Sequence, residues 1–244
     1  MKAAGTAGSL ACSGQDGRTE RFGGQDRFPS FWRRYALVWE PWRCGRASLR
    51  VARVADLARH VDVEALLRDP HAPEPPYWAH LWVGSRALAR YLVEHPWLPA
   101  GRCLEVGCGL GLVSLVSAQM GGQAFAFDHD ADAVGLCRLN AVANDLRVHL
   151  WQGDLQRFAL RERFELICAA DVTYDPALQT ALLDLAWASL GRGGCLVAAE
   201  SVRTFDRAWL AEAQARGFAV HEVRVMEMED ARPVEVRLVV MRWR

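Results

Sequence analysis

Lysine is almost absent from this sequence. Lys2 is the only lysine among 244 residues, so arginine supplies all but one of the 29 basic side chains. Schiff-base catalysis and a Walker-type phosphate-binding lysine are therefore excluded. The 29 basic residues are balanced by 29 acidic ones, so no excess of positive charge marks a dedicated binder of polyanions.

Long apolar runs and paired cysteines are also missing. The sequence has no run of about 18 apolar residues and no apolar core of a secretory signal, so we expect a cytoplasmic protein without a membrane span. The seven cysteines form no CxxC pair and are odd in number, which disfavours a zinc site or a disulfide framework. Cys103 and Cys168 lie in apolar runs that are typical of buried, reduced thiols. We expect no bound metal.

The composition divides the chain into three segments. Residues 1–27 are small, polar and glycine-rich, and they predict a flexible tail. Residues 28–76 are aromatic and basic and end in the proline-rich stretch 71–76, and we interpret them as an extension that roofs the site. Residues 77–244 are long enough, and apolar enough, for one large α/β domain.

Helix and strand patterns alternate from residue 77 onward. Helices are expected over 82–94, 111–120, 131–144, 176–190 and 204–216, and strands over 102–106, 124–128, 147–152, 164–170, 195–200, 217–225 and 234–243. Helices between the first five strands predict a parallel, doubly wound sheet, and the last two strands predict a hairpin that adds one antiparallel strand. The predicted fold class is α/β, with a Rossmann-like, doubly wound, seven-stranded, mostly parallel sheet plus the N-terminal extension.

A glycine-rich loop follows the first of these strands. Gly107, Gly109 and Gly111 have GxGxG spacing at a strand–helix junction, where backbone N–H groups can approach a ligand closely. A dinucleotide fingerprint needs GxGxxG, but residue 112 is leucine. Glu105 at the strand end can hold an ammonium group, so the loop suits a cationic ligand better than a pyrophosphate.

Two further strand ends carry acidic residues. Asp128 ends the second strand, where a carboxylate can bind a ribose diol. Asp154 follows the third strand and can accept from an adenine amino group, while Leu155 can cover the ring. Each aspartate alone is more often a helix cap. Ligands of such sheets bind at the carboxyl ends of the strands, so the set together predicts a nucleoside-binding edge.

Four features of the sequence resemble class I, seven-β-strand S-adenosylmethionine-dependent methyltransferases. They are the strand–LEVGCGLG–helix segment, the acidic end of the second strand, the Gly-Asp pair after the third strand and the closing hairpin. The resemblance covers about residues 75–244. It implies the strand order 3-2-1-4-5-7-6, S-adenosylmethionine as methyl donor and S-adenosylhomocysteine as product.

A narrower resemblance lies just before the first helix of the domain. Residues 75–82, PPYWAHLW, are similar to a segment of the protein lysine methyltransferase group that includes the electron-transfer-flavoprotein β-subunit lysine methyltransferase. This resemblance implies that Trp82 borders the cofactor pocket. The sequence departs from the group at Val83, where proline is usual, so this loop is expected to be set differently.

The end of the fourth strand resembles the D-x-x-Y motif of the same group through Asp171 and Tyr174. Asp171 can orient an amine through N–H hydrogen bonds, and Tyr174 can present an electron-rich ring to a methyl group or an ammonium. The alternative is a helix cap and a packing residue. His80 and His129 are alternative bases, although a structural role is more common for such histidines. Glu200, at the end of the fifth strand, can shape the acceptor site.

Residues 31–60 contain seven arginines interleaved with aromatic residues. Such a segment can clamp single-stranded RNA, but a roof over the site with solvated arginines is the interpretation we favour. The sequence therefore predicts an S-adenosylmethionine-dependent methyltransferase that modifies a protein side chain, lysine first. The alternatives are a small-molecule methyltransferase and a catalytically silent cofactor-binding or RNA-binding subunit.

Overall fold

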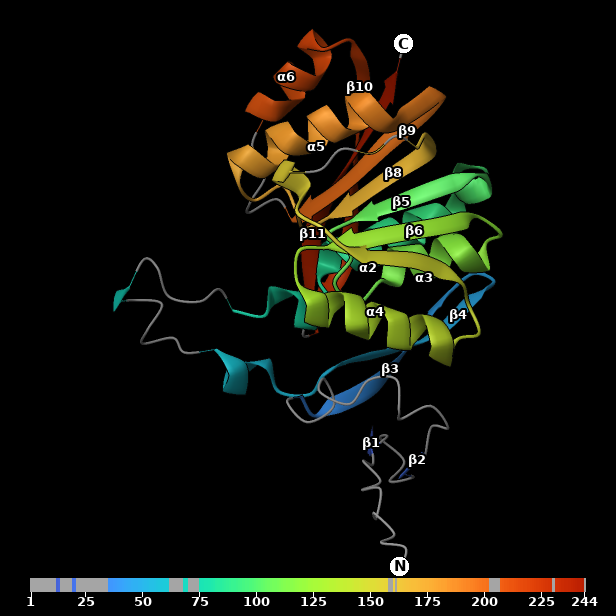
Figure 1. The fold of residues 1–244 in the computed structure, drawn as a ribbon, viewed down its shortest axis with the longest axis vertical. Coiled ribbons are helices and arrows are strands. Elements are labelled where there is room, and N and C mark those ends of the chain that lie inside the picture. The colour runs from blue at the N-terminus through green and yellow to red at the C-terminus, as the bar shows by residue number, and fades with distance from the viewer. Residues whose placement is uncertain are drawn as a thin grey trace, which may run out of the picture.

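A seven-stranded sheet forms the centre of the protein (Figure 1). The structure is a computed structural model, and it describes residues 12–13, 19–20, 35–61, 68–69, 75–157, 160, 162–201, 207–229 and 231–243. The strands lie in the order β10-β11-β9-β8-β5-β6-β7. Their bounds are β5 Arg102–Val106, β6 Gln123–Asp128, β7 Val148–Gln152, β8 Phe164–Ala170, β9 Leu190–Ser201, β10 Phe218–Glu229 and β11 Arg232–Trp243.

The sheet topology confirms the predicted fold class. β7, β6, β5, β8 and β9 pair in parallel, whereas β11 is antiparallel to both of its neighbours. Counted along the chain from β5, the order is 3-2-1-4-5-7-6. The central strands are apolar and buried because helices cover both faces of the sheet, which is the usual arrangement for parallel strands.

Two layers of helices cover the sheet. The first consists of α2 (Val83–Glu94), α3 (Leu112–Gln119) and α4 (Ala131–Ala143), and the second of α5 (Pro176–Ser189) and α6 (Ala208–Ala215) (Figure 1). Two of these helices begin at side-chain caps: Asp130 accepts from Asp132 N at 2.7 Å, and Asp175 accepts from Ala177 N at 2.7 Å. These caps fix where each helix starts after its strand.

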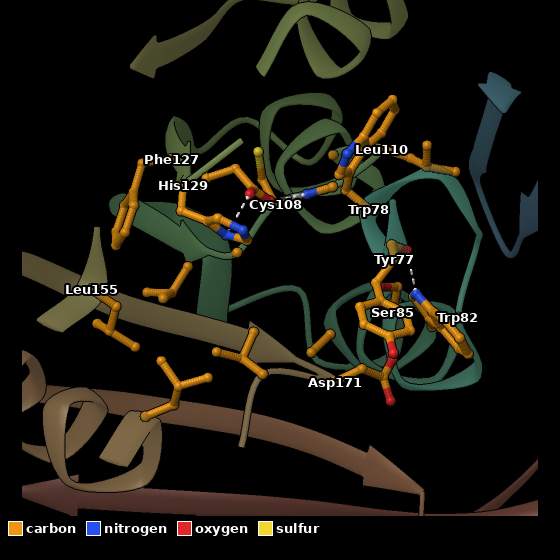
Figure 2. Close-up of a pocket in the computed structure, with 18 of the residues that line it drawn as sticks. Tyr77, Trp78, Trp82, Ser85, Cys108, Leu110, Phe127, His129, Leu155 and Asp171 are labelled. Carbon is orange, nitrogen blue, oxygen red and sulfur yellow. Dashed lines mark hydrogen bonds and ion pairs between the residues drawn. The ribbon is translucent and has the colours of Figure 1, made fainter. Parts of the chain in front are cut away.

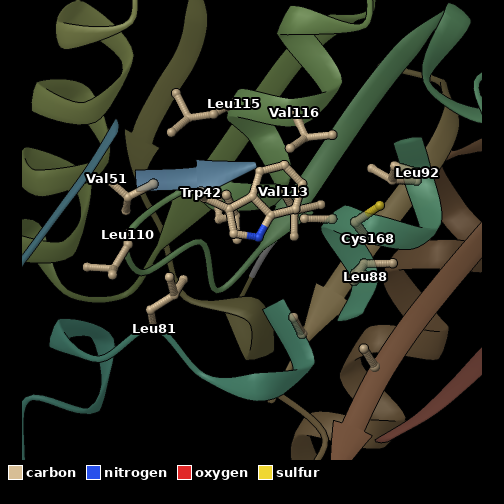
Figure 3. Packing of buried hydrophobic residues seen from close by; sticks show 14 of the residues in the cluster. Trp42, Val51, Leu81, Leu88, Leu92, Leu110, Val113, Leu115, Val116 and Cys168 are labelled. Carbon is tan, nitrogen blue, oxygen red and sulfur yellow. The ribbon is translucent and has the colours of Figure 1, made fainter. Parts of the chain in front are cut away.

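A separate β-hairpin packs on the first helical layer. It consists of β3 (Leu37–Cys44) and β4 (Ala47–Val54), joined through Gly45, whose φ of 51° suits the tight turn. β4 contacts α3 and α4, and Trp42 of β3 belongs to the same buried cluster as Val113 of α3 (Figure 3). The hairpin thereby extends the apolar core beyond the sheet.

Three strands are longer than the sequence predicts. β9 begins at residue 190 rather than 195, and its first part is Gly191-Arg192-Gly193-Gly194. Glycine is depleted in strands, so the pattern indicated a loop there. β10 runs to residue 229 and β11 starts at 232, because the last residues of β10, from Met226 on, pair with the first residues of β11, up to Glu235. This stretch is charged and contains methionine. Its residues are mostly charged or exposed, and one of its two buried side chains is Glu227, so no apolar alternation reveals the strand pair.

Little of the predicted N-terminal tail is described. β1 (Cys12–Ser13) and β2 (Thr19–Glu20) form a short antiparallel pair, and the rest of residues 1–34 lies outside the described residues. Short 3-10 helices η3 (Leu57–His60) and η4 (Tyr77–Ala79) precede α2. Within the described chain, no helix has the length and apolarity needed to cross a membrane.

Candidate functional site

A cavity of about 750 Å³ opens at the carboxyl ends of the parallel strands. Nine of the ten predicted site residues line it: Trp82, Gly107, Gly109, Gly111, Asp128, Asp154, Leu155, Asp171 and Tyr174. They come from the start of α2 and from the loops after β5, β6, β7 and β8, so the fold brings together residues that are far apart in the sequence. Figure 2 shows one end of the cavity at Phe127 and Leu155 and the other at Tyr77, Trp82 and Asp171.

The glycine loop has a backbone that only glycine adopts readily. Gly107, Gly109 and Gly111 have φ angles of 63°, 48° and 79°, in the left-handed region. A Cβ atom on Gly109 would lie 3.2 Å from the carbonyl oxygen of Trp78, and one on Gly111 would collide with the sulfur of Cys137. The loop is therefore held close to its neighbours, and its backbone faces the cavity.

The end of β6 supplies a buried carboxylate beside this loop. Asp128 Oδ2 accepts from Gly109 N at 2.9 Å, and Oδ1 accepts from Asp130 N at 3.0 Å. Oδ1 also lies 3.3 Å from His129 Nδ1, whereas Oδ2 has a second lone pair that can accept from a ligand that enters the cavity. Asp128 thus fixes the loop and remains available for a diol.

The loop after β7 closes this end of the cavity. Asp154 is exposed, and its Oδ1 accepts from Gln156 N at 2.9 Å at the start of the 3-10 helix η6 (Leu155–Arg157). Leu155 is buried and lines the cavity with Phe127 (Figure 2). The cap that the alternative interpretation expects is present at Asp154, and the side chain also lies at the cavity, so the two roles are compatible.

Glu105 is the one predicted site residue that the structure places away from the cavity lining. Its carboxylate is buried and accepts from the backbone N and the hydroxyl of Ser114, in the first turns of α3. Burial raises the pKa of Glu105 to about 7, against the lowering effect of these hydrogen bonds and that of Val113. A direct contact between Glu105 and an ammonium group stays a prediction.

Asp171 is the central side chain at the other end of the cavity. Its backbone φ is 56°, a left-handed conformation that few residues other than glycine adopt. Burial raises the pKa of its carboxyl to about 8; the charges of Glu200 and Glu229 also raise it, and the backbone N–H groups of Ser85 and Gly84 lower it. Oδ2 has no hydrogen-bond partner among the described residues. Strain, a raised pKa and an unfilled acceptor are typical of a functional group.

The start of α2 holds this carboxylate. The N–H groups of Gly84 and Ser85 point toward Asp171 at the positive end of the helix dipole. A Cβ atom on Gly84 would collide with the carboxylate of Asp171. Glycine at position 84 is therefore required for the close approach of helix and carboxylate, and no pattern in the sequence indicates this contact.

Gly84→Ala is expected to push the Asp171 carboxylate out of place, because the added Cβ atom collides with it. It should also lower the midpoint of thermal unfolding, even though alanine is the better helix former by about 1 kcal/mol. In an Asp171→Ala background the collision is gone, so the same substitution should raise the midpoint. Thermal unfolding of the unaltered protein, the two single variants and the double variant measures the shift that Gly84→Ala causes in each background. Equal shifts in the two backgrounds would contradict the collision.

Glu200 holds the turn that contains Asp171 and Tyr174 through hydrogen bonds to Thr173. Glu200 Oε1 accepts from Thr173 N at 2.5 Å and from Thr173 Oγ1 at 2.6 Å, and Gln179 Nε2 donates to Thr173 O at 2.8 Å. All three side chains are buried. Glu200 thus supports this turn and places its charge near Asp171, while Tyr174 remains about half exposed at the cavity.

Both candidate histidines line the cavity, at different ends. His129 Nδ1 lies 3.3 Å from Asp128 Oδ1, near the glycine loop, and His80 Nε2 lies 3.9 Å from Glu229 Oε1. The ring of His80 packs edge-on against Trp82, with centroids 4.7 Å apart. The described residues include no group of three His, Cys, Asp or Glu side chains placed to hold a metal ion.

Several aromatic and apolar wall residues were missed by the sequence reasoning. Tyr77, Trp78, Phe127 and Leu178 all line the cavity. Trp82 Nε1 donates to Tyr77 O at 2.7 Å, which holds Tyr77 and Trp82 together at the Asp171 end of the cavity (Figure 2). The aromatic stretch before α2 was a signal that could have been extended to Tyr77 and Trp78, whereas Phe127 and Leu178 look like ordinary core residues in the sequence.

The charge of the cavity has one sign. Among the described residues that line it, four are aspartates and none is lysine or arginine, although the chain contains 29 basic residues. Opposite charges attract more strongly in a partly desolvated cleft than in bulk water. The cavity therefore favours a cationic ligand and disfavours phosphate groups.

Comparison with known proteins agrees with this geometry. The family model "Methyltransferase small domain" matches residues 77–203, more than half of the chain. The chain belongs to this methyltransferase family.

Among the curated relatives, the electron transfer flavoprotein beta subunit lysine methyltransferase of Xenopus laevis is 34% identical over 112 residues, 45% of each chain. A ubiquinone biosynthesis O-methyltransferase of Nitrobacter winogradskyi is 30% identical over 108 residues, 44% of this chain and 40% of its own. The match spans under half the length of these relatives.

A solved structure, the T. thermophilus 16S rRNA N2 G1207 methyltransferase in complex with AdoMet and guanosine, superposes with a TM-score of 0.62 at 17% identity, over 85% of this chain and 51% of that one. At this identity the likeness shows the fold.

S-adenosylmethionine is the cofactor of this methyltransferase, and the cavity fits it. A cavity of about 750 Å³ is in the usual range for a ligand of this size. The sulfonium and ammonium groups of the cofactor are cationic, as the aspartate-rich lining requires. The backbone of the glycine loop, Asp128, Asp154 and Leu155 are the residues that would hold it.

Proposed function

We propose that this methyltransferase transfers a methyl group to a protein side chain, and that the side chain is a lysine. The observation that carries the proposal is the acceptor end itself. There, the carboxylate of Asp171 lies near Tyr77 and Trp82 (Figure 2), with Tyr174 on the same turn and no lysine or arginine among the described residues of the cavity lining. A carboxylate with aromatic rings beside it is a good environment for an ammonium group.

The acceptor nitrogen must lose a proton before it can attack, and Asp171 can assist. The bound cofactor supplies an electrophilic methyl group. An ammonium group that enters the site lowers the pKa of Asp171 from about 8, so the carboxylate forms and accepts N–H hydrogen bonds through its unfilled Oδ2. A carboxyl group with a pKa close to the working pH is also suited to accept the proton of the amine.

The relatives support a protein substrate without fixing it. The name of the Xenopus laevis relative describes a lysine methyltransferase, and the name of the Nitrobacter winogradskyi relative describes an O-methyltransferase of ubiquinone biosynthesis. The second name describes transfer to oxygen, whereas the acidic lining of this cavity favours a cationic acceptor. We therefore favour lysine.

The proposal is tested by transfer of label from methyl-labelled S-adenosylmethionine into an undermethylated cell lysate. We expect label in discrete, protease-sensitive bands, with methyl-lysine found by mass spectrometry. The Asp171→Asn protein, added at the same concentration, controls for methyltransferases of the lysate and should add no label. Label confined to the low-molecular-weight fraction, or found in protein only on residues other than lysine, would contradict the lysine proposal.

A further inference from the structure

The outer edge of the hairpin is covered by side-chain amides instead of a third strand. Three side-chain amides, one in α3, one in α4 and one at the residue that follows α4, each bind the N–H and the C=O of one residue of β4. They are Gln119 with Ser48 at 3.2 and 3.1 Å, Asn144 with Arg50 at 2.9 and 2.8 Å, and Asn140 with Ala52 at 2.7 and 3.1 Å, the N–H distance first in each pair.

The spacing of these contacts follows from strand geometry. In an antiparallel pair, alternate residues turn their backbone groups toward the partner strand, and the others turn theirs away. Ser48, Arg50 and Ala52 are the outward residues of β4, and each would leave two backbone groups without a partner. A carboxamide has a donor and an acceptor side by side, so it satisfies both groups of one residue.

Asn140 differs from the other two amides because it also contacts the glycine loop. Its Nδ2 donates to Leu110 O at 2.9 Å, and Leu110 stands between Gly109 and Gly111. Asn140 is completely buried. The Leu110 side chain is buried as well, in the same cluster as Trp42 and Val51 of the hairpin (Figure 3).

We propose that Asn140 is a positioning residue for the cofactor loop, and that the hairpin is part of the support of the cofactor site. The N–H and C=O of Ala52 fix which way the amide of Asn140 faces, because Oδ1 must accept and Nδ2 must donate. The second N–H of Nδ2 then points at Leu110 O. Without the hairpin the amide can turn, and the loop loses this anchor.

The cofactor loop needs such an anchor more than an ordinary loop does. Three of its five residues are glycines, which lose the most conformational freedom on being fixed. A binding site that is already ordered loses less entropy when its ligand binds. The hairpin lies outside residues 77–203, which the family model matches, so this support is an addition to the shared domain.

The experiment compares Asn140→Ala with Asn144→Ala, using S-adenosylhomocysteine as the probe in calorimetry. Both variants remove one amide from the same edge of the hairpin, but only Asn140 touches the loop. We expect Asn140→Ala to weaken S-adenosylhomocysteine binding by about tenfold or more, the equivalent of one hydrogen bond. Asn144→Ala should bind it within about twofold of the unaltered protein. Gln119→Ala serves as a second control of the same kind.

Thermal unfolding of each variant separates positioning from general loss of structure. If the binding loss of every variant follows its loss of stability, Asn140 is merely structural and the proposal is overturned. Unchanged binding by Asn140→Ala overturns it as well. Asn140→Ser, which keeps one hydroxyl donor, covers the case in which alanine prevents folding, and its binding should also be weaker than that of Asn144→Ala. The probe carries no methyl group to transfer, so the outcome is independent of the lysine proposal.

Discussion

Asp171→Asn is expected to lower methyl transfer by about 10²–10⁴-fold, while S-adenosylhomocysteine binds within about twofold of its normal affinity. Asparagine has nearly the same shape and can still accept from the N–H groups at the start of α2. It carries no negative charge, so it can neither compensate an ammonium nor take up its proton. Binding of S-adenosylhomocysteine is preserved because the residues around the glycine loop are unchanged.

Turnover with labelled lysate and calorimetry with S-adenosylhomocysteine check this expectation. Asp184→Asn is a matched control, since Asp184 lies on α5, is exposed, pairs with Arg216 and does not line the cavity. The control should transfer methyl groups at the normal rate. An Asp171→Asn protein with normal turnover would remove Asp171 from the acceptor site and leave His80, which also lines this part of the cavity, as the candidate base.

The strands and the loops at their ends could be read from the sequence because they depend on local patterns. Apolar runs of strand length, separated by helical spacing, predicted the strands and their parallel pairing, the family resemblance implied their order, and the glycine spacing placed the loop after β5. The carboxyl ends of parallel strands meet at one edge, so Asp128, Asp154 and Asp171 reach the same cavity.

The position of Glu105 shows where such reasoning fails. Successive side chains of a strand point to opposite faces of the sheet. Val106, next to it, lines the cavity, while Glu105 points toward α3 and is bound by Ser114. The sequence indicates that a carboxylate stands near the end of the strand, but the pleat decides which face receives it.

Contacts between distant segments could not be predicted at all. Asn140 and Ala52 are 88 residues apart in the chain, and nothing in either neighbourhood indicates their contact. Gly84 in the same way looks like a poor helix residue until Asp171 is seen beside it. Both depend on packing between elements, for which a single sequence has no periodic signal.

Removing the carboxyl group of Asp171 is also expected to stabilise the protein, by an amount that depends on pH. The pKa of this carboxyl is about 8 in the folded protein, against 3.8 when it is unperturbed. Between these values the folded state keeps a proton that the unfolded state has lost. Stability therefore falls as the pH rises from about 4 to about 8, with a slope of at most about 1.4 kcal/mol per pH unit from this group.

Asp171→Asn lacks this titration, so its advantage in free energy of unfolding should be near zero at about pH 4 and reach a few kcal/mol at pH 8. Urea unfolding of both proteins at pH 5 and pH 8 measures the difference. Glu105, whose pKa is raised to about 7, destabilises both proteins equally and cancels. An advantage of the same size at both pH values would show that burial does not raise the pKa of Asp171. An advantage that increases from pH 5 to pH 8 would mean that burying the carboxyl group of Asp171 lowers the stability of the folded protein.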